Sequence, residues 1–216
     1  FLIIVNLTYQ ELMCGIVGIY LKTKKFEKNL GRMLSGMLNN MESRGPDSAG
    51  FAIYKNEGNK IYKFSLCINN LNFNIFKKEL SKKIKKIKLN QISDHVTLKT
   101  EEKPKKVLEI LNLNFPEVSI VGYGKSIEIF KQVGNPKDVV KKFKLGDFSG
   151  THGIGHTRMA TESAITTDGS HPYSTGEDEC LVHNGSLSNH NNLRRKLKKN
   201  GIKFDSLNDT EVAAGY

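Results

Sequence analysis

The chain has 216 residues, of which 38% are hydrophobic and 25% are charged, and its formal net charge is +11. This composition is typical of a globular protein with one large domain or two small ones, and no apolar run approaches the ~20 residues that a membrane-spanning helix needs. Three cysteines are too few for a disulfide framework, so we expect a reducing, cytoplasmic setting.

The positive charge is concentrated in the middle of the chain. Residues 60–150 carry 19 lysines and 9 acidic residues, and the whole chain has 28 lysines but 5 arginines. Proteins that bind nucleic acids also rely on arginine, so the favoured interpretation is a solvated, lysine-rich surface. A patch for an anionic partner is the alternative, and nucleic-acid binding there would weaken steeply with salt.

The first third of the chain predicts a strand, a helix and a second strand. Residues 14–20 are apolar, β-branched and punctuated by glycine, as in a buried strand. From Phe26 to Met41, apolar residues recur at steps of three and four, which indicates one face of an amphipathic helix. Turn residues at 44–50 end this helix, and we expect a second strand at 51–54.

The middle of the chain, residues 57–150, is weakly patterned and contains no motif. Its sequence favours a strand at 119–124 and a short helix at 136–143. Cys67 has no partner signature, and we expect it to be a packed thiol. We interpret this stretch as a variable segment of the same domain.

The last third predicts strands, turns and two helices. In chain order, we expect a strand running into a turn at 154–161, a loop at 170–174, a short strand with a turn at 180–185, a helix through Leu193 and Leu197 that stops at Gly201, and a helix that begins behind Asp209 as its N-cap. The chain ends within that last helix, so we expect the sequence to be truncated there.

Cys14 follows Met13, and cysteine is small enough for the preceding methionine to be removed. The product would carry a thiol and a free α-amine on one residue. An α-amine has a pKa near ~7.7–8, so it can accept a proton at neutral pH and serve as the thiol's general base. The alternative is a buried cysteine that opens a strand.

Six motifs in the chain occur in an order that resembles one family. They are Met13-Cys-Gly-Ile-Val-Gly18, Arg44-Gly-Pro-Asp-Ser-Ala-Gly50, Gly155-His-Thr-Arg-Met-Ala-Thr161, Ser170-His-Pro172, Val182-His-Asn-Gly185 and Asn208-Asp-Thr-Glu-Val212. Together they resemble the class II glutamine amidotransferase domain, an N-terminal-nucleophile (Ntn) hydrolase. The set is most similar to the stand-alone amidotransferase subunit of glutamate synthase-like and N-methylglutamate synthase-like systems.

The resemblance covers residues 13–56 and 151–216 well and the middle poorly. It implies an α+β fold, a four-layer α/β/β/α sandwich of two mostly antiparallel sheets, over one domain from 13 to 216. Residues 1–12 lie before the motif that would have to start the mature protein. We expect these residues to be a non-native extension. The alternatives are that they form a propeptide, or that the whole protein is a non-catalytic relative of the family.

The resemblance also implies a catalytic set. Cys14 would be the nucleophile that attacks the side-chain amide of glutamine and forms a thioester, and water would then release glutamate. Asn184 and Gly185 match the family's oxyanion positions, a side-chain amide and a backbone N–H. Without the other motifs, the Asn-Gly pair would be interpreted as an ordinary hairpin turn.

Two charged residues match the positions that hold free glutamine. Arg158 matches the clamp for the substrate carboxylate, which the fork of a guanidinium suits. Asp209 matches the residue that receives the α-ammonium. The alternatives are a surface salt bridge for Arg158 and a plain helix cap for Asp209.

Further residues match positions around the same pocket. Thr161 and His171 match residues that line it, and Arg44 matches the arginine of the loop beside the nucleophile. We expect Asp47 to brace that loop. For His183 we expect a packing or supporting role, because the α-amine already supplies the base.

A zinc site is a competing interpretation of four residues in the last third. His152, His156, Cys180 and His183 have the residue types of zinc ligands. On a strand, however, residues 180 and 183 point to opposite faces, so we expect no metal site.

The resemblance implies no cofactor in this chain. It implies that ammonia passes to a separate glutamate synthase-like subunit, which would carry FMN and an iron–sulfur cluster. Met159 stands where the hexosamine-forming branch of the family has tryptophan, which argues against that branch. An inactive subunit with a role in assembly or regulation is the alternative.

Overall fold

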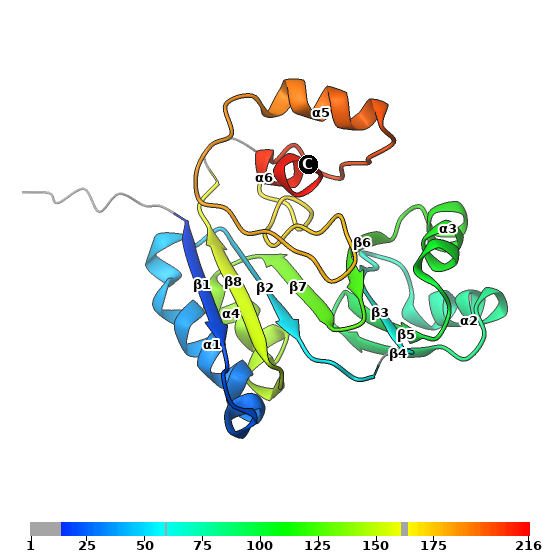
Figure 1. Ribbon diagram of the computed structural model, residues 1–216, viewed down its shortest axis with the longest axis horizontal. Coiled ribbons are helices and arrows are strands. Elements are labelled where there is room, and N and C mark those ends of the chain that lie inside the picture. Colours follow the sequence, from blue (N-terminus) through cyan, green and yellow to red (C-terminus); the bar gives the residue numbers. More distant parts are fainter. Residues whose placement is uncertain (1–13, 59, 161–163) are drawn as a thin grey trace, which may run out of the picture.

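The computed structural model describes residues 14–58, 60–160 and 164–216 (Figure 1). It contains eight named strands: β1 Gly15–Tyr20, β2 Ser48–Tyr54, β3 Tyr62–Cys67, β4 Lys88–Ile92, β5 His95–Thr100, β6 Ser119–Gly124, β7 Ile127–Val133 and β8 His152–Arg158. Its α-helices are α1 Leu30–Asn40, α2 Phe73–Lys83, α3 Pro104–Asn114, α4 Pro136–Lys142, α5 His190–Lys199 and α6 Asp209–Ala214. Short 3-10 helices lie at Lys24–Asn29, Glu42–Arg44 and Leu145–Asp147.

The strands form two antiparallel sheets of four strands each. The first sheet has the order β1-β8-β2-β7, and the second has the order β4-β5-β3-β6. In the first sheet, Gly15 lies opposite Thr157 and Tyr20 lies opposite His152. This pairing brings the start of β1 to the end of β8, although some 140 residues separate them in the chain.

Three apolar clusters hold the layers together. Helices α1 and α4 cover one face of the first sheet, where Leu34 and Phe51 are fully buried. Helices α2 and α3 cover the second sheet, where Phe76 and Leu98 are fully buried. A smaller cluster around Ile129 joins strands of both sheets. The α+β sandwich with two antiparallel sheets, expected from the resemblance to Ntn hydrolases, is confirmed.

The first strand and helix lie near their predicted positions. The predicted amphipathic helix starts with a 3-10 segment at Lys24–Asn29 and becomes α-helical at Leu30. The expected strand at 51–54 was too short, because β2 already begins at Ser48. Ser48 pairs with both Val133 and Arg158, so it lies inside the sheet rather than in a turn.

The middle of the chain is more ordered than its sequence indicates. It holds the whole second sheet together with β7 and three helices, which the weak sequence pattern did not reveal. The expected strand at 119–124 and the expected helix at 136–143 are present as β6 and α4. The side chain of Asn72 caps α2, and Pro104 opens α3 at the position that proline tolerates.

The last third differs from its prediction at two places. The expected strand at 180–185 is absent among the described residues, where an isolated bridge joins Leu181 to Tyr173. The cap of α6 is Asn208 rather than Asp209, because the Asn208 side chain accepts the N–H of Thr210 at 2.9 Å. Helix α5 ends before Gly201, whose φ of +88° suits a helix terminator.

The last third lies over one end of the first sheet, with α5 and α6 above the loops that follow β8 (Figure 1). No helix among the described residues is long and apolar enough to cross a membrane.

Candidate active site

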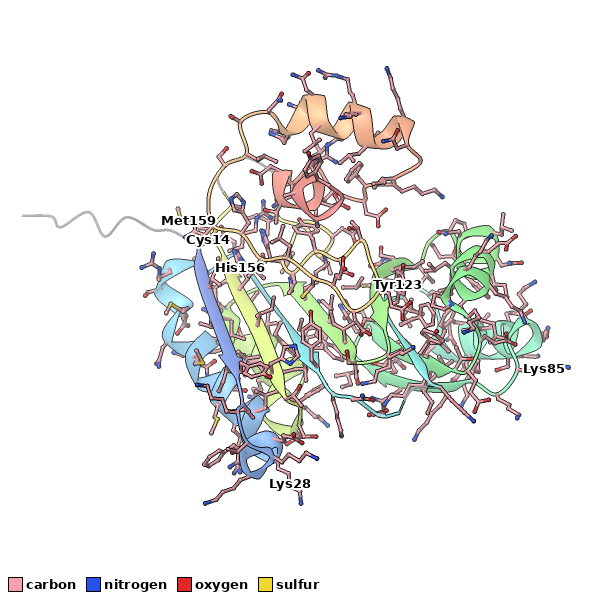
Figure 2. All side chains as sticks on the ribbon, in the orientation of Figure 1. Cys14, Lys28, Lys85, Tyr123, His156 and Met159 are labelled. Carbon is pink, nitrogen blue, oxygen red and sulfur yellow. The ribbon has the colours of Figure 1, made fainter. Side chains whose placement is uncertain are left out.

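Cys14 lies half-buried at the start of β1, beside the residue that follows β8. Its Sγ accepts the backbone N–H of Met159 at 3.4 Å and lies 3.7 Å from the Met159 carbonyl oxygen. The next residue, Gly15, donates its N–H to Thr157 Oγ1 at 3.2 Å. Figure 2 shows Cys14, Met159 and His156 together at this end of the sheet. The predicted nucleophile is therefore held by backbone contacts at the meeting point of two strands.

Gly15 is needed at this position because of its close neighbours. A Cβ added there would lie 2.7 Å from Thr157 Oγ1 and 2.9 Å from Met41 Cβ. A larger residue would push β1 away from β8 and move Cys14 with it.

Asn184 reaches the predicted nucleophile from a segment 170 residues further along the chain. Its Nδ2 donates to the Cys14 carbonyl oxygen at 3.1 Å. Asn184 and Gly185 are both exposed, so nothing among the described residues covers them from solvent. The structure brings Cys14 and this pair together, while their roles in catalysis stay predictions.

The turn at 44–47 is packed against the end of β8. Asp47 donates its backbone N–H to the Arg158 carbonyl at 3.1 Å, and its Oδ2 accepts the N–H of Ala160 at 2.8 Å. A Cβ at Gly45 would lie 2.5 Å from the Thr157 carbonyl. Arg44 lies exposed on this turn, and no described hydrogen bond joins its side chain to Cys14.

Arg158 is the last residue of β8, and only 4% of its surface is exposed. Its guanidinium donates to the Ala164 carbonyl at 3.3 Å, so the side chain is directed toward the loop that follows β8. A buried guanidinium in this position can meet a carboxylate with a bidentate pair of hydrogen bonds. Thr161, also predicted to line the pocket, lies outside the described residues.

Asp209 begins α6 and holds the segment that follows Asn184. Its Oδ2 accepts the backbone N–H of Leu187 at 2.6 Å. The carboxylate therefore serves a structural purpose besides the ammonium-binding role that the resemblance implies. It is linked to the Asn184 segment by this bond and to two histidines through the neighbouring residue, Thr210.

Three histidines, His156, His171 and His183, lie close together beside Asn184. His156 places its Nε2 3.0 Å from the His183 carbonyl, and its ring stacks on that of His171 with the centroids 3.9 Å apart. Burial lowers the pKa of His156 to about 4 and the pKa of His171 still further. Both rings are therefore neutral at pH 7, which excludes them as carriers of positive charge there.

His156 was considered from the sequence only as a candidate zinc ligand, and Thr210 was given no role of its own. Both stand inside motifs that were used for the family resemblance, so the signal was present. Their importance depends on contacts with residues 27 positions away or more, which the sequence does not show.

The four residues of the alternative zinc site make other contacts in the described part of the chain. His152 stacks on Tyr54 with ring centroids 4.1 Å apart, and Cys180 Sγ lies 3.3 Å from the Tyr54 hydroxyl. His156 instead pairs with the backbone of His183. Among the described residues, the one close group of three possible metal ligands contains none of these four residues.

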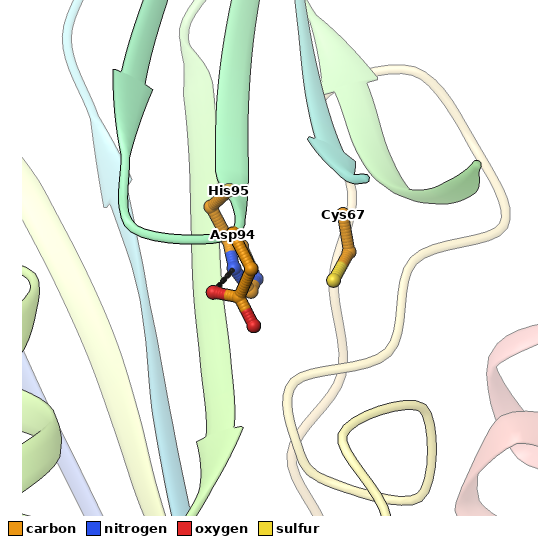
Figure 3. A group of neighbouring side chains, drawn as sticks. All are labelled: Cys67, Asp94 and His95. Atoms are coloured by element: carbon orange, nitrogen blue, oxygen red, sulfur yellow. Dashed lines mark hydrogen bonds and ion pairs between the residues drawn. The ribbon is translucent and has the colours of Figure 1, made fainter. Parts of the chain in front are cut away.

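That group is Cys67, Asp94 and His95, whose ligand atoms lie within 4.8 Å of one another (Figure 3). His95 Nδ1 is hydrogen-bonded to Asp94 Oδ1 at 3.1 Å. This bond occupies one ring nitrogen of His95 and one carboxylate oxygen of Asp94. Burial raises the pKa of the Cys67 thiol to about 11, which keeps it protonated. We interpret the group as packing beside the β4–β5 turn.

Comparison with known proteins identifies the family. A model of the glutamine amidotransferase domain family matches residues 146–215. A glutamine amidotransferase-like protein, GlxB, from Rhizobium meliloti is 49% identical over 207 residues, which cover 94% of this chain and 69% of that protein. A protein from Methanothermobacter thermautotrophicus, assigned by name to the glutamine amidotransferases, is 30% identical over 226 residues. The match covers 94% of this chain and 71% of that protein.

A more distant relative shares part of the chain. Glutamine–fructose-6-phosphate aminotransferase (isomerizing) of Aquifex aeolicus is 38% identical over 108 residues, which cover 50% of this chain and 18% of that enzyme. The α+β sandwich of two antiparallel sheets is consistent with this family. The chain belongs to the class II glutamine amidotransferase family.

Proposed function

We propose that this protein is a glutaminase subunit that hydrolyses the side-chain amide of L-glutamine with Cys14 as an N-terminal nucleophile. The family supports glutamine as the substrate. The proposed catalytic domain runs from residue 13 to 216 and works in a reducing, cytoplasmic setting. The mature enzyme would begin at Cys14, after removal of Met13 and of any residues before it.

The proposed reaction has two steps. The Cys14 thiol gives its proton to its own α-amine, and the sulfur attacks the amide carbon of glutamine. The amine then protonates the departing nitrogen, so ammonia leaves and a γ-glutamyl thioester forms. Water adds to the thioester carbon, the C–S bond breaks, and glutamate and the free thiol are released. The sum is glutamine plus water giving glutamate plus ammonia.

The oxyanion that forms in each step needs hydrogen-bond donors that are already in position. The Asn184 side-chain amide and the Gly185 N–H are the proposed donors. Arg158 is the proposed partner of the substrate carboxylate, and Asp209 that of the α-ammonium. Thr161, His171 and Arg44 are proposed to line the same pocket.

One observation carries this proposal, the 3.1 Å hydrogen bond from Asn184 Nδ2 to the Cys14 carbonyl. Two residues that the family resemblance pairs, 170 positions apart in the chain, are in contact. The interpretation of Cys14 as a buried cysteine that merely opens a strand does not require this contact. A donor so close to the nucleophile is what an oxyanion site requires.

We further propose that the released ammonia is used by a separate glutamate synthase-like subunit. That partner would carry FMN and an iron–sulfur cluster, and this chain would contribute no cofactor. The second candidate is an inactive subunit with a role in assembly or regulation. The complete set of Cys14, Arg158, Asn184, Gly185 and Asp209 favours the active subunit.

The test is an intact mass combined with an ammonia assay. The protein is expressed from Met13, and its mass is recorded before and after treatment with a glutamine-like diazo ketone, which alkylates an activated thiol in a glutamine pocket. We expect loss of methionine, one adduct on Cys14 that excess glutamine prevents, and release of glutamate and ammonia in equal amounts.

A folded sample that has lost Met13 but forms no adduct and releases no ammonia would contradict the proposal. It would favour the inactive subunit. Ammonia release that rises when the flavin-containing partner is added would support the synthase assignment, and release that the partner leaves unchanged would count against it.

A further inference from the structure

The hydroxyl of Thr210 lies at the centre of a set of contacts that the proposed mechanism does not use. His171 Nε2 lies 2.9 Å from it and His183 Nδ1 lies 3.3 Å from it. The Asp209 carboxylate lies 3.3 Å away on the third side. Thr210 is 1% exposed, so solvent does not compete for these contacts. We propose that Thr210 is a positioning residue that sets the proton on His183 and thereby holds the Asn184–Gly185 segment in place.

The protons in this set can be counted. A threonine hydroxyl has one donor and two acceptor sites, and an ionised carboxylate only accepts. The hydroxyl must therefore donate to Asp209. Both histidines must then donate to the hydroxyl, His171 from Nε2–H and His183 from Nδ1–H. The neutral state of His171, which burial enforces, agrees with a single ring proton on Nε2.

The same counting applies to His156, because a backbone carbonyl only accepts. His156 donates Nε2–H to the His183 carbonyl at 3.0 Å, and its ring stacks on His171. The contacts form a closed circuit that runs from His156 to His183, to Thr210, to His171 and back to His156. Since β8, the loop after it, the 183–185 segment and α6 each supply one member, the circuit joins four parts of the chain.

The circuit fixes one end of the proposed oxyanion segment, and Asp209 fixes the other. His183 is held through both its carbonyl and its ring, while Leu187 is held through its N–H by Asp209 Oδ2 at 2.6 Å. The His183 ring also fills the space next to Gly185, where an added Cβ would lie 2.9 Å from Nε2. Asn184 and Gly185 are thus held between two anchored residues, although both are exposed.

This inference rests on the proposed function for its kinetic consequence. Thr210→Val keeps the shape of the side chain but leaves two buried N–H donors unpaired. His183 loses its ring partner, whereas Asp209 keeps the bond to Leu187. The loss should therefore fall on the oxyanion segment more than on the ammonium site. We expect kcat to fall by about 10- to 100-fold, as for loss of a supporting residue, and KM to rise by no more than about threefold.

The first measurement is a long-range ¹H–¹⁵N correlation on histidine-labelled wild-type protein. The chain has six histidines, which single histidine-to-glutamine variants assign. We expect Nδ1–H at His183 and Nε2–H at His171 and His156. In Thr210→Val, the His183 signal should lose its fixed Nδ1–H form, and in Thr210→Ser it should keep it.

The second measurement compares the kinetics of three variants. Thr210→Ser retains the hydroxyl and should recover kcat to within about threefold of wild type. Thr97→Val is the matched control, because Thr97 is also buried and its hydroxyl bonds Glu128 at 3.5 Å, away from Cys14 in β5. It should leave kcat unchanged even where it lowers stability.

The outcomes separate the inference from the proposed function. An Nε2–H form at His183 in wild type, or equal kcat for Thr210→Val and Thr210→Ser, would overturn the role of Thr210. A wild-type protein that does not hydrolyse glutamine would overturn the proposed function instead. The ring-proton result would still decide the positioning role in that case.

Discussion

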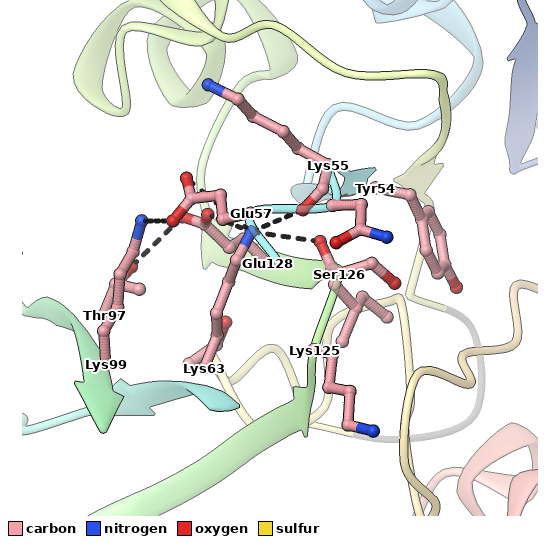
Figure 4. A network of polar contacts seen from close by, with 12 residues as sticks. Tyr54, Lys55, Glu57, Lys63, Thr97, Lys99, Lys125, Ser126 and Glu128 are labelled. Carbon is pink, nitrogen blue, oxygen red and sulfur yellow. Dashed lines mark hydrogen bonds and ion pairs between the residues drawn. The ribbon is translucent and has the colours of Figure 1, made fainter. Parts of the chain in front are cut away.

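The molecule contains two buried polar networks, one around Thr210 and one around Lys63, and they differ in composition and role. Around Thr210, the rings of His171 and His183 share one hydroxyl, and the Asp209 carboxylate lies beside it. Around Lys63, a fully buried ammonium in β3 is surrounded by acceptors (Figure 4). Both networks join segments that are distant in the sequence.

The Lys63 network links the two sheets. The ammonium donates to the carbonyls of Lys55 at 2.8 Å and Ser126 at 3.3 Å and to the Glu128 carboxylate at 3.0 Å. A charge buried in this way is stable only when its partners are complete. This network holds strands in place, whereas the Thr210 network orients groups that stand next to Cys14. Burial alone therefore does not distinguish a structural network from one that supports a reaction.

The largest expected effect concerns catalysis at Cys14, beside the Thr210 network. Cys14→Ser should lower kcat for glutamine hydrolysis by at least about a thousandfold, because removal of a nucleophile abolishes covalent catalysis. Ammonia release measures it. Cys180→Ser is the matched control, because this half-buried thiol contacts Tyr54 and should keep kcat within about twofold. If Cys14→Ser kept a tenth of the activity, Cys14 would not be the nucleophile.

The next difference is in stability. Lys63→Met leaves the half-buried Glu128 carboxylate without its cation, and we expect the free energy of unfolding to fall by about 3 kcal/mol. Urea unfolding measures this change. The kcat of the folded fraction should stay within about twofold of wild type.

Lys99→Met provides the control for this prediction. Its ammonium pairs with Glu57, and its side chain is 23% exposed, so the loss should stay below about 1 kcal/mol. A Lys63→Met protein as stable as wild type would contradict the structural role of the Lys63 network. A variant that folds but has lost its activity would contradict the distinction between this network and the one around Thr210.

The smallest expected effect is the pH dependence of stability from the histidine circuit. Burial holds the pKa of His156 at about 4, below the value of about 6.5 for an unfolded chain. Between these values the unfolded chain binds a proton that the folded protein does not, so stability falls as the pH drops from 6.5 toward 4. We expect a loss of about 2 kcal/mol at pH 5 from this residue.

Unfolding of wild type and His156→Gln at pH 7, 6 and 5 measures this loss. The variant should be less stable at pH 7 but should show a shallower decline between pH 6.5 and 5. If the stability of both proteins declined in parallel, His156 would not cause the loss of stability in acid. In this respect the histidine circuit would then resemble the Lys63 network more closely.

The sequence drew attention to the edge around Cys14 but not to the second sheet, for a physical reason. The residues near Cys14 belong to ordered motifs that carry the family resemblance, and Asn184 and Arg158 were selected from those motifs together rather than one residue at a time. The second sheet is hidden because β3 buries Lys63 and Ser65 alongside Phe64 and Leu66, so no alternation of polar and apolar residues marks its faces.

The errors in the last third have a similar cause. Residues 180–185 have the composition of a strand, yet the segment makes one bridge and then serves the proposed site. Asp209 looks like a helix cap, but Asn208 takes that position and leaves the carboxylate for Leu187. Tertiary contacts decided the first case, whereas in the second case two adjacent residues are about equally good helix caps and local preference could not choose between them.

The order of the strands has a consequence for the time at which Cys14 becomes part of a folded edge. Among the described strands, β1 has β8 as its one neighbour, and β8 is synthesised about 140 residues later. At ~5–20 residues per second, the ribosome needs on the order of 10 s to supply that partner. During this interval β1 lacks its described partner strand, so the removal of Met13 that the proposed function requires would have this time in which to occur before the sheet closes around Cys14.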